Sequence, residues 1–201
     1  VFKQVLGFIR PGIRELEVAA EIERLFKLKG GSGPSFPTIV ASGPRSALPH
    51  AASTQKKIAS GDLLLFDMGA VYDGYCSDLS RTVVMGRATA RQRKIYSLVL
   101  DAQETALSSV RRGMRLSTLD GRGRMVIKKA GYAGKFGHSL GHGVGIEVHE
   151  LPAVSSKNRT VIEKGMVFTV EPGVYIPGWG GVRIEDMVAV TEVGPRVLTQ
   201  S

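Results

Sequence analysis

The sequence is poor in the features that mark secreted and membrane proteins. Cys76 is the single cysteine, which excludes an internal disulfide framework. No apolar run approaches the roughly 18 residues that a membrane-spanning helix needs, and no low-complexity tract is present. The N-terminal stretch does not resemble a signal peptide, which has a basic start and an apolar centre. We therefore expect a globular protein of the reducing cytoplasm.

Acidic residues are outnumbered, since 27 Lys and Arg stand against 18 Asp and Glu and give a net charge of +9. Such an excess suggests nucleic acid as a partner, because clustered cations release counterions from phosphates. The cations occur instead in short groups, mostly in segments predicted to be helices: 56–57, 87–94, 111–115 and 128–129. Solvated helix surfaces explain such groups more simply, so nucleic-acid binding is only a weak alternative.

The sequence does contain enough apolar material for one sizeable core. Hydrophobic residues make up 43% of the 201 residues, which predicts a single compact domain over 1–201. Hydrophobic periodicity predicts helices over 1–8, 16–29, 91–112 and 117–130, the last weakened by Gly121 and Gly123. Strands are predicted over 36–42, 63–66 (running into Asp67), 166–174 and 181–190, with a return strand that carries 77–78 and 81–85. The glycine-rich segment 137–145 is predicted to be loop or tightly packed strand.

The two halves of the sequence carry acids in the same arrangement. In each half helices come first, and then an apolar strand runs into an acid, Asp67 or Glu171. A glycine-containing turn follows, and then a second acid, Asp78 or Glu185. Residues equally far from a hairpin turn face each other, so each hairpin brings its two acids together. This weak internal repeat predicts an α+β domain with pseudo-twofold symmetry, whose sheets curve around a central site.

Four carboxylates crowded in an apolar setting predict bound cations, because alone they repel one another and raise each other's pKa. The alternative, exposure on unrelated turns, is opposed by the apolar runs before Asp67 and Glu171. Three of the four histidines, His138, His142 and His149, also fall within twelve residues of glycine-rich sequence. Carboxylates with an imidazole suit manganese, cobalt or zinc, and four acids favour two ions.

Five segments of the sequence resemble the pita-bread metallopeptidases, the family of methionine aminopeptidase, Xaa-Pro aminopeptidase and prolidase. They are SALPH ending at His50, FDMGAVYDGYCSDLSRT, HSLGHGVGIEVHE, GMVFTVEPGVYIP and GGVRIED. In this order the segments are highly specific, and they extend over essentially the whole chain. The resemblance implies the pita-bread fold, in which helices flank a curved antiparallel sheet.

The resemblance implies two divalent ions, with manganese the first expectation and cobalt or zinc the alternatives. Asp67 would bind one ion, Asp78 and Glu185 would bridge the pair, and His142 and Glu171 would complete the second ion. Glu171 would also shuttle a proton.

Four further residues are implied to lie outside the metal ligands. His50 would help to position the substrate, and His138 would line the pocket on the side of the leaving group. His149 would hydrogen-bond the scissile carbonyl, and Arg183 would support a bridging acid.

Within this family, SDLSRT and GVRIED resemble the proline-specific members. They imply an exopeptidase that hydrolyses the Xaa-Pro bond of dipeptides or peptide N-termini with a hydroxide activated by two metal ions. Lys157 or Arg159 is a candidate for binding the carboxylate of a dipeptide. Proline-specific members usually have an N-terminal domain, so we expect this chain to be the catalytic domain without it and the full-length form to be a homodimer.

Three other functions stay open. A general aminopeptidase like methionine aminopeptidase would use the same ligands. A non-catalytic binding module on this fold is expected to lack some ligands, whereas all five are present, and creatine-type amidinohydrolysis does not need metals. Cys76 is interpreted as a small packed residue and not as a nucleophile.

Overall fold

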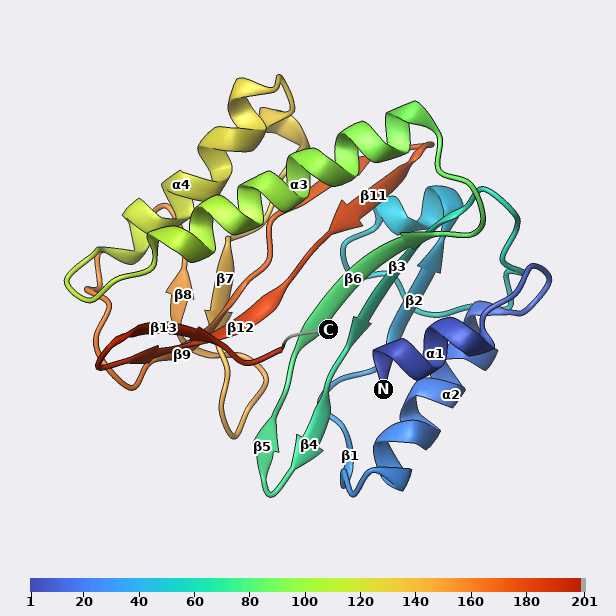
Figure 1. Cartoon of the computed structure of the whole chain (residues 1–201), viewed down its shortest axis with the longest axis horizontal. Coiled ribbons are helices and arrows are strands. Elements are labelled where there is room, and N and C mark those ends of the chain that lie inside the picture. Colours follow the sequence, from blue (N-terminus) through green and yellow to red (C-terminus); the bar gives the residue numbers. More distant parts are fainter. Residues whose placement is uncertain (200–201) are drawn as a thin grey trace.

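The computed structural model describes residues 1–199, which form two halves of similar plan (Figure 1). The first half starts with helices α1 (Phe2–Phe8) and α2 (Glu15–Leu28). One sheet has the order β2 (Ile39–Ser42), β3 (Leu63–Met68), β6 (Leu79–Val84), and a smaller sheet has the order β1 (Gly33–Pro34), β4 (Ala70–Tyr72), β5 (Tyr75–Cys76). The short 3-10 helix η1 (Gly43–Ala47) follows β2.

The second half repeats this order of helices and then strands. It starts with α3 (Ala90–Ser109), α4 (Leu116–Lys129) and the 3-10 helix η2 (Ala133–Lys135). The larger sheet has the order β13 (Gly194–Val197), β12 (Asp186–Thr191), β9 (Val167–Val170), β7 (Gly141–Gly143), β8 (Glu150–Val154), and β10 (Gly173–Ile176) pairs with β11 (Gly180–Arg183). All strand pairs are antiparallel. This confirms the α+β class.

A long hairpin that is interrupted at its midpoint forms the centre of each half. In the first hairpin, Asp73 and Gly74 make the predicted turn with φ of 48° and 80°, the left-handed conformation that such two-residue turns require. In the second, residues 171–172 separate β9 from β10, and residues 184–185 separate β11 from β12. The predictions of continuous strands over 166–174 and 181–190 are therefore wrong at these positions. Pro172 explains the first break, because it has no N–H to donate to a neighbouring strand.

Each pair of helices covers its own sheet with a separate apolar core (Figure 1). Ile22 of α2 and Phe66 of β3 are fully buried in the first core, and Leu119 of α4 and Phe168 of β9 are fully buried in the second. The helix predicted over 117–130 is confirmed as α4, although Gly121 and Gly123 lower its helix propensity. A Cβ on Gly123 would lie 3.0 Å from Leu140 Cδ1, so the glycine lets the helix pack closely on its neighbours.

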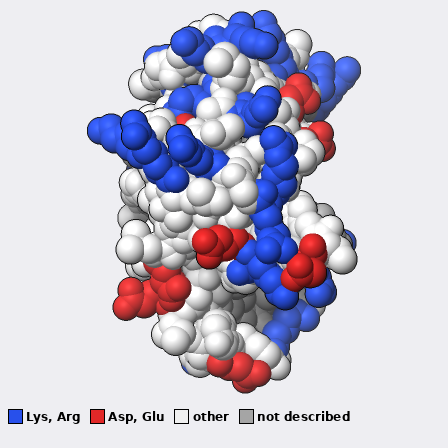
Figure 2. Space-filling model, turned by 90° about the vertical axis from the view of Figure 1, so that its left-hand side faces the viewer, with Lys and Arg blue, Asp and Glu red and all other residues white. Residues whose placement is uncertain are grey.

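The excess of cations is spread over the surface in several groups. On the face drawn in Figure 2, Lys and Arg side chains occur in groups with acidic side chains among them. Glu192 pairs with both Arg112 at 2.8 Å and Lys164 at 2.6 Å. Within the described residues, no helix is both long and apolar enough to cross a membrane.

Candidate metal centre

The interrupted midpoints of the two hairpins bring four acids together. Asp67 of β3 faces Ser80 of β6, and Asp78 lies immediately before β6. Asp67 and Asp78 are thus diagonal neighbours on adjacent strands. The symmetry of the hairpin had predicted that they lie directly opposite each other. Glu171 and Glu185 lie in the breaks of the second hairpin, between the flanking strand pairs. The hairpins meet at this point, because the Glu185 N–H donates to the Ser80 carbonyl at 3.1 Å.

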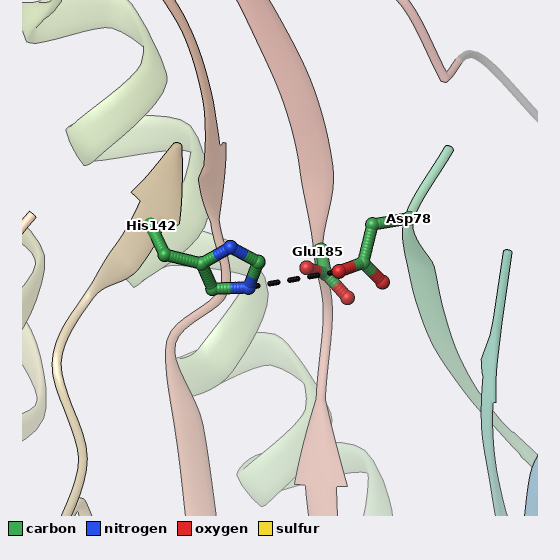
Figure 3. A group of neighbouring side chains, drawn as sticks. All are labelled: Asp78, His142 and Glu185. Atoms are coloured by element: carbon green, nitrogen blue, oxygen red, sulfur yellow. Dashed lines mark ion pairs between the residues drawn. The ribbon is translucent and has the colours of Figure 1, made fainter. Parts of the chain in front are cut away.

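His142 of β7 points its ring at this cluster. Its Nε2 lies 3.6 Å from Asp78 Oδ2 and 3.4 Å from Glu171 Oε1. Asp78, His142 and Glu185 each offer one donor atom, all within 4.8 Å of one another, and Figure 3 shows the three side chains converging from different segments. His142 Nδ1 lies 3.0 Å from the Gly143 carbonyl. A carbonyl can only accept, so Nδ1 carries the proton and Nε2 offers its lone pair to the cluster.

Burial makes the charged forms of these side chains costly. Burial, followed by the charges of Asp67 and Glu171, raises the pKa of Asp78 to about 9. Burial also raises the pKa of Glu171 to about 7. For Glu185, burial and then the charge of Asp78 raise the pKa well above its ordinary value. Burial lowers the pKa of His142. By itself the protein therefore favours the neutral forms of these groups.

The donor atoms fit divalent cations. Asp78 Oδ1 is buried and has no hydrogen-bond partner within residues 1–199. A buried oxygen without a partner is unfavourable, and a bound cation would supply that partner and offset the repulsion between the acids. Carboxylate oxygens with one imidazole nitrogen form a donor set suited to manganese, cobalt or zinc.

Asp67 is linked to the cluster through Ser80 and Arg183. Ser80 Oγ donates to Glu185 Oε2 at 2.6 Å and lies 3.1 Å from Asp67 Oδ1. Arg183, 3% exposed, donates from Nε to Ser80 Oγ at 2.7 Å and from NH2 to Asp67 Oδ2 at 2.5 Å. The guanidinium thus holds Asp67 directly and reaches the predicted bridging acid Glu185 through Ser80.

Tyr175 extends this network to His138. Arg183 NH1 donates to the Tyr175 hydroxyl at 3.0 Å, and that hydroxyl lies 2.9 Å from His138 Nε2. His138 Nδ1 lies 2.8 Å from the Ser139 carbonyl, so it is the protonated nitrogen and Nε2 accepts from the hydroxyl. Burial lowers the pKa of His138 to about 4. The ring is therefore neutral near pH 7.

One cavity of about 820 Å³ lies against the four acids, His142, His138 and Arg183. The five predicted metal ligands and the four residues implied to lie beside them all line it: His50, Asp67, Asp78, His138, His142, His149, Glu171, Arg183 and Glu185. The rings of His142 and His149 are 4.3 Å apart between centroids. Phe36, Pro37 and Ile39 contribute an apolar wall.

Lys157 and Arg159 do not line this cavity, contrary to their suggested role as carboxylate ligands. Both are exposed, and their segment is tied to the start of α4, where the Ser117 N–H donates to the Asn158 carbonyl at 2.8 Å. Cys76 is partly buried, and burial raises the pKa of its thiol, which is consistent with a packed residue.

Three residues of this site were not singled out from the sequence as functional: Ser80, Thr169 and Tyr175. Thr169 Oγ1 donates to Glu171 Oε1 at 3.0 Å and accepts from the His142 N–H at 3.1 Å. Both Ser80 and Thr169 lie two residues from a predicted ligand, Asp78 or Glu171, a spacing that puts two side chains on the same face of an extended segment. This spacing could have identified Ser80 and Thr169 from the sequence. Tyr175 reaches its partners only through the tertiary fold.

Known proteins resemble this chain over nearly its whole length. It is 51% identical over 193 residues to the Xaa-Pro dipeptidase of Pyrococcus furiosus, covering 96% of this chain and 56% of that protein. Its structure matches the prolidase from Pyrococcus furiosus with a TM-score of 0.96 and 50% identity, covering 98% of this chain and 58% of the other. For the X-Pro aminopeptidase from Thermotoga maritima the TM-score is 0.97 at 44% identity, with 100% and 57% covered.

These likenesses confirm the expected pita-bread fold. The chain spans just over half of the length of the relatives it matches. The family model described as "Metallopeptidase family M24" matches residues 1–192, a range that includes both hairpins and all of the acids at their midpoints. A cluster of side chains that could hold metal ions at the centre of this fold agrees with that description, and the chain belongs to metallopeptidase family M24.

Proposed function

We propose that this chain is the catalytic domain of a metal-dependent exopeptidase that hydrolyses the bond before proline, in dipeptides or at peptide N-termini. The observation that carries the proposal is the buried cluster of Asp78, His142, Glu171 and Glu185, with Asp78 Oδ1 left without a partner. The names of the relatives, Xaa-Pro dipeptidase, prolidase and X-Pro aminopeptidase, support proline as the preferred second residue.

The proposed ligands are those that the sequence predicted. Asp67 would hold one ion, Asp78 and Glu185 would lie between the two, and His142 with Glu171 would hold the second. When bound, two divalent ions polarise a carbonyl oxygen as Lewis acids and lower the pKa of water. Manganese is proposed because the donors are mostly carboxylate oxygens.

The side chains around the cluster would bind and orient the substrate and move its proton. Glu171 would take a proton from the attacking water and pass it to the proline nitrogen, which must leave as an amine. His149 would hydrogen-bond the carbonyl of the scissile bond, and its place beside the ring of His142 supports this. His50 would position the substrate, and neutral His138 would lie on the side of the leaving proline.

The cavity wall supports selection of proline. Proline has no amide N–H to donate. A site that contacts its ring with apolar groups therefore forgoes no hydrogen bond when it binds proline. Phe36, Pro37 and Ile39 provide such a surface within the same cavity. A homodimer and a cytoplasmic location are proposed for the full-length protein, the location on the ground of the single cysteine in these 201 residues.

A substrate panel tests the function. The metal-loaded chain should cleave Xaa-Pro dipeptides or Xaa-Pro-containing tripeptides, lose this activity in EDTA and regain it with added manganese. Faster cleavage of Met-Ala-Ser than of any Xaa-Pro substrate would instead indicate a methionine aminopeptidase. A protein that holds two ions and cleaves no peptide would indicate a binding module.

A further inference from the structure

We infer that Asp120 and Arg124, an ion pair on α4, are positioning residues that hold His138 against the substrate cavity. The role of His138 in the reaction rests on the proposed function. The restraint on the backbone around His138 rests only on the contacts of α4. In Figure 1 the chain turns back after α4 and returns to β7, and His138 lies on this returning segment, residues 136–140.

The ion pair binds three backbone groups of that segment. Arg124 Nε and NH2 each donate to one oxygen of Asp120 at 2.8 Å. The same guanidinium donates to the carbonyls of Phe136 at 3.0 Å and of His138 at 2.8 Å. Asp120 Oδ1 accepts the Leu140 N–H at 3.1 Å. The guanidinium of Arg124 and the carboxylate of Asp120 thus fix the backbone of residues 136–140 at both ends and in the middle.

Ring contacts extend this restraint to the side chain of His138. The guanidinium carbon of Arg124 lies 4.2 Å from the centroid of the Phe136 ring. That ring meets the imidazole of His138 edge to face, with 5.0 Å between centroids. The imidazole is therefore held by this stack and by the Tyr175 hydroxyl, which donates to its Nε2.

The other anchors of the segment lie at its two ends, where Phe136 and Leu140 are buried in the core and the Leu140 carbonyl accepts the Glu171 N–H at 2.8 Å. Residues 136–140 belong to no helix or strand, and Gly137 makes the backbone permissive. Asp120 is fully buried on an α4 that packs on the same segment through Gly123 and Leu140. A buried carboxylate needs a cationic partner, and Arg124 meets that need while it also fixes the loop.

Hydrogen–deuterium exchange of the whole chain tests the restraint without any need for activity. Arg124→Lys keeps the charge but replaces the planar guanidinium with a compact ammonium. The ammonium cannot donate to Asp120 and to both carbonyls with the same geometry. Exchange of the Leu140 N–H, which donates to Asp120, should become about tenfold faster, as expected for loss of a charge-assisted hydrogen bond. The matched control, Arg122→Lys on the exposed side of the same helix, should leave it unchanged. Equal exchange in the wild type and Arg124→Lys would overturn the inference.

A double-mutant cycle tests whether the restraint acts through His138. Arg124→Lys should lower kcat/KM for an Xaa-Pro peptide about tenfold in the wild type but less than about twofold in His138→Ala, because nothing is then left to position. Equal losses in both backgrounds would show that the ion pair does not act through His138. If the wild type cleaves no Xaa-Pro substrate, the proposed function fails, and the exchange comparison still decides whether Asp120 and Arg124 hold the segment.

Discussion

The carboxyl group of Asp78 is buried with one oxygen lacking a partner, in contact range of an imidazole and near two other acids. A side chain in this position lowers the stability of the metal-free protein when it ionises, and it becomes favourable only with a cation beside it. We therefore expect Asp78 to contribute to metal binding and not to the folded state alone.

Asp78→Asn should abolish the binding of at least one of the two proposed ions, because an amide is neutral and a weaker ligand. We expect the metal content to fall and kcat/KM to drop at least about a hundredfold. Elemental analysis and peptide assays measure the two effects. Glu104→Gln, an exposed acid on α3, is the control and should change neither. A fully loaded Asp78→Asn protein would contradict the ligand assignment.

Tyr175 is a second residue whose loss should be measurable by itself. Its buried hydroxyl is shared between His138 and Arg183, so Tyr175→Phe leaves a buried acceptor and a buried donor each short of one partner. The free energy of unfolding should fall by about 1–3 kcal/mol, measured by urea denaturation. Tyr72→Phe, at a ring that is 58% exposed, is expected to have no effect. Similar stabilities of the two variants would argue against the network.

At the scale of the elements, the position of the metal centre depends on close approach of strands. β7 carries His142 and lies against β9, and a Cβ on Gly141 would be 1.9 Å from the Thr169 carbonyl oxygen. Only glycine permits this contact. The same strand pair also places Thr169 where it bonds both His142 and Glu171.

Gly141→Ala should therefore separate β7 from β9 and move His142 away from the acids. We expect a loss of stability of at least about 3 kcal/mol, together with weaker metal binding. Gly137→Ala is a matched control in the same glycine-rich segment, because a Cβ there meets nothing within 4 Å. Thermal unfolding and metal titration distinguish the two variants, and equal behaviour would show that the strands can move apart without cost.

At the scale of the whole molecule, two hairpins from different halves share one charged centre, so metal binding and global stability are linked. In the metal-free protein the pKa of Asp78 is raised to about 9 by burial and neighbouring charges, and that of Glu185 is also raised. A folded-state pKa above the unfolded value means that the folded state binds more protons. Its stability must then decrease as the pH rises towards the folded-state pKa.

The clearest window for this effect is pH 7 to 9. Below it, the lowered pKa values of His138 and His142 act in the opposite direction, because these buried histidines favour folding as the pH rises towards their ordinary value. Between pH 7 and 9 the melting temperature in EDTA should fall by about 5 °C or more. With saturating manganese the acids are held ionised, so the fall should be much smaller. Parallel curves in EDTA and manganese would contradict the linkage.

The sequence by itself determined the helices, the repeat of two hairpins and the family, because hydrophobic periodicity and ordered motifs are local properties. It also indicated Asp67, Asp78, His142, Glu171 and Glu185 as one set, and all of them line the same cavity. Only the tertiary structure decided the register that makes Asp67 and Asp78 diagonal neighbours, and the breaks at 171–172 and 184–185.

Contacts between distant segments were likewise beyond the sequence. Arg183 reaches Asp67 across 116 positions of the chain, and Arg124 holds the loop of His138 from another element. Lys157 and Arg159 looked suitable by charge, yet their segment is anchored to the start of α4, away from the cavity. The physical reason is general. A residue type shows which chemistry is available, but the direction and burial of its side chain depend on packing between elements that are remote in the chain.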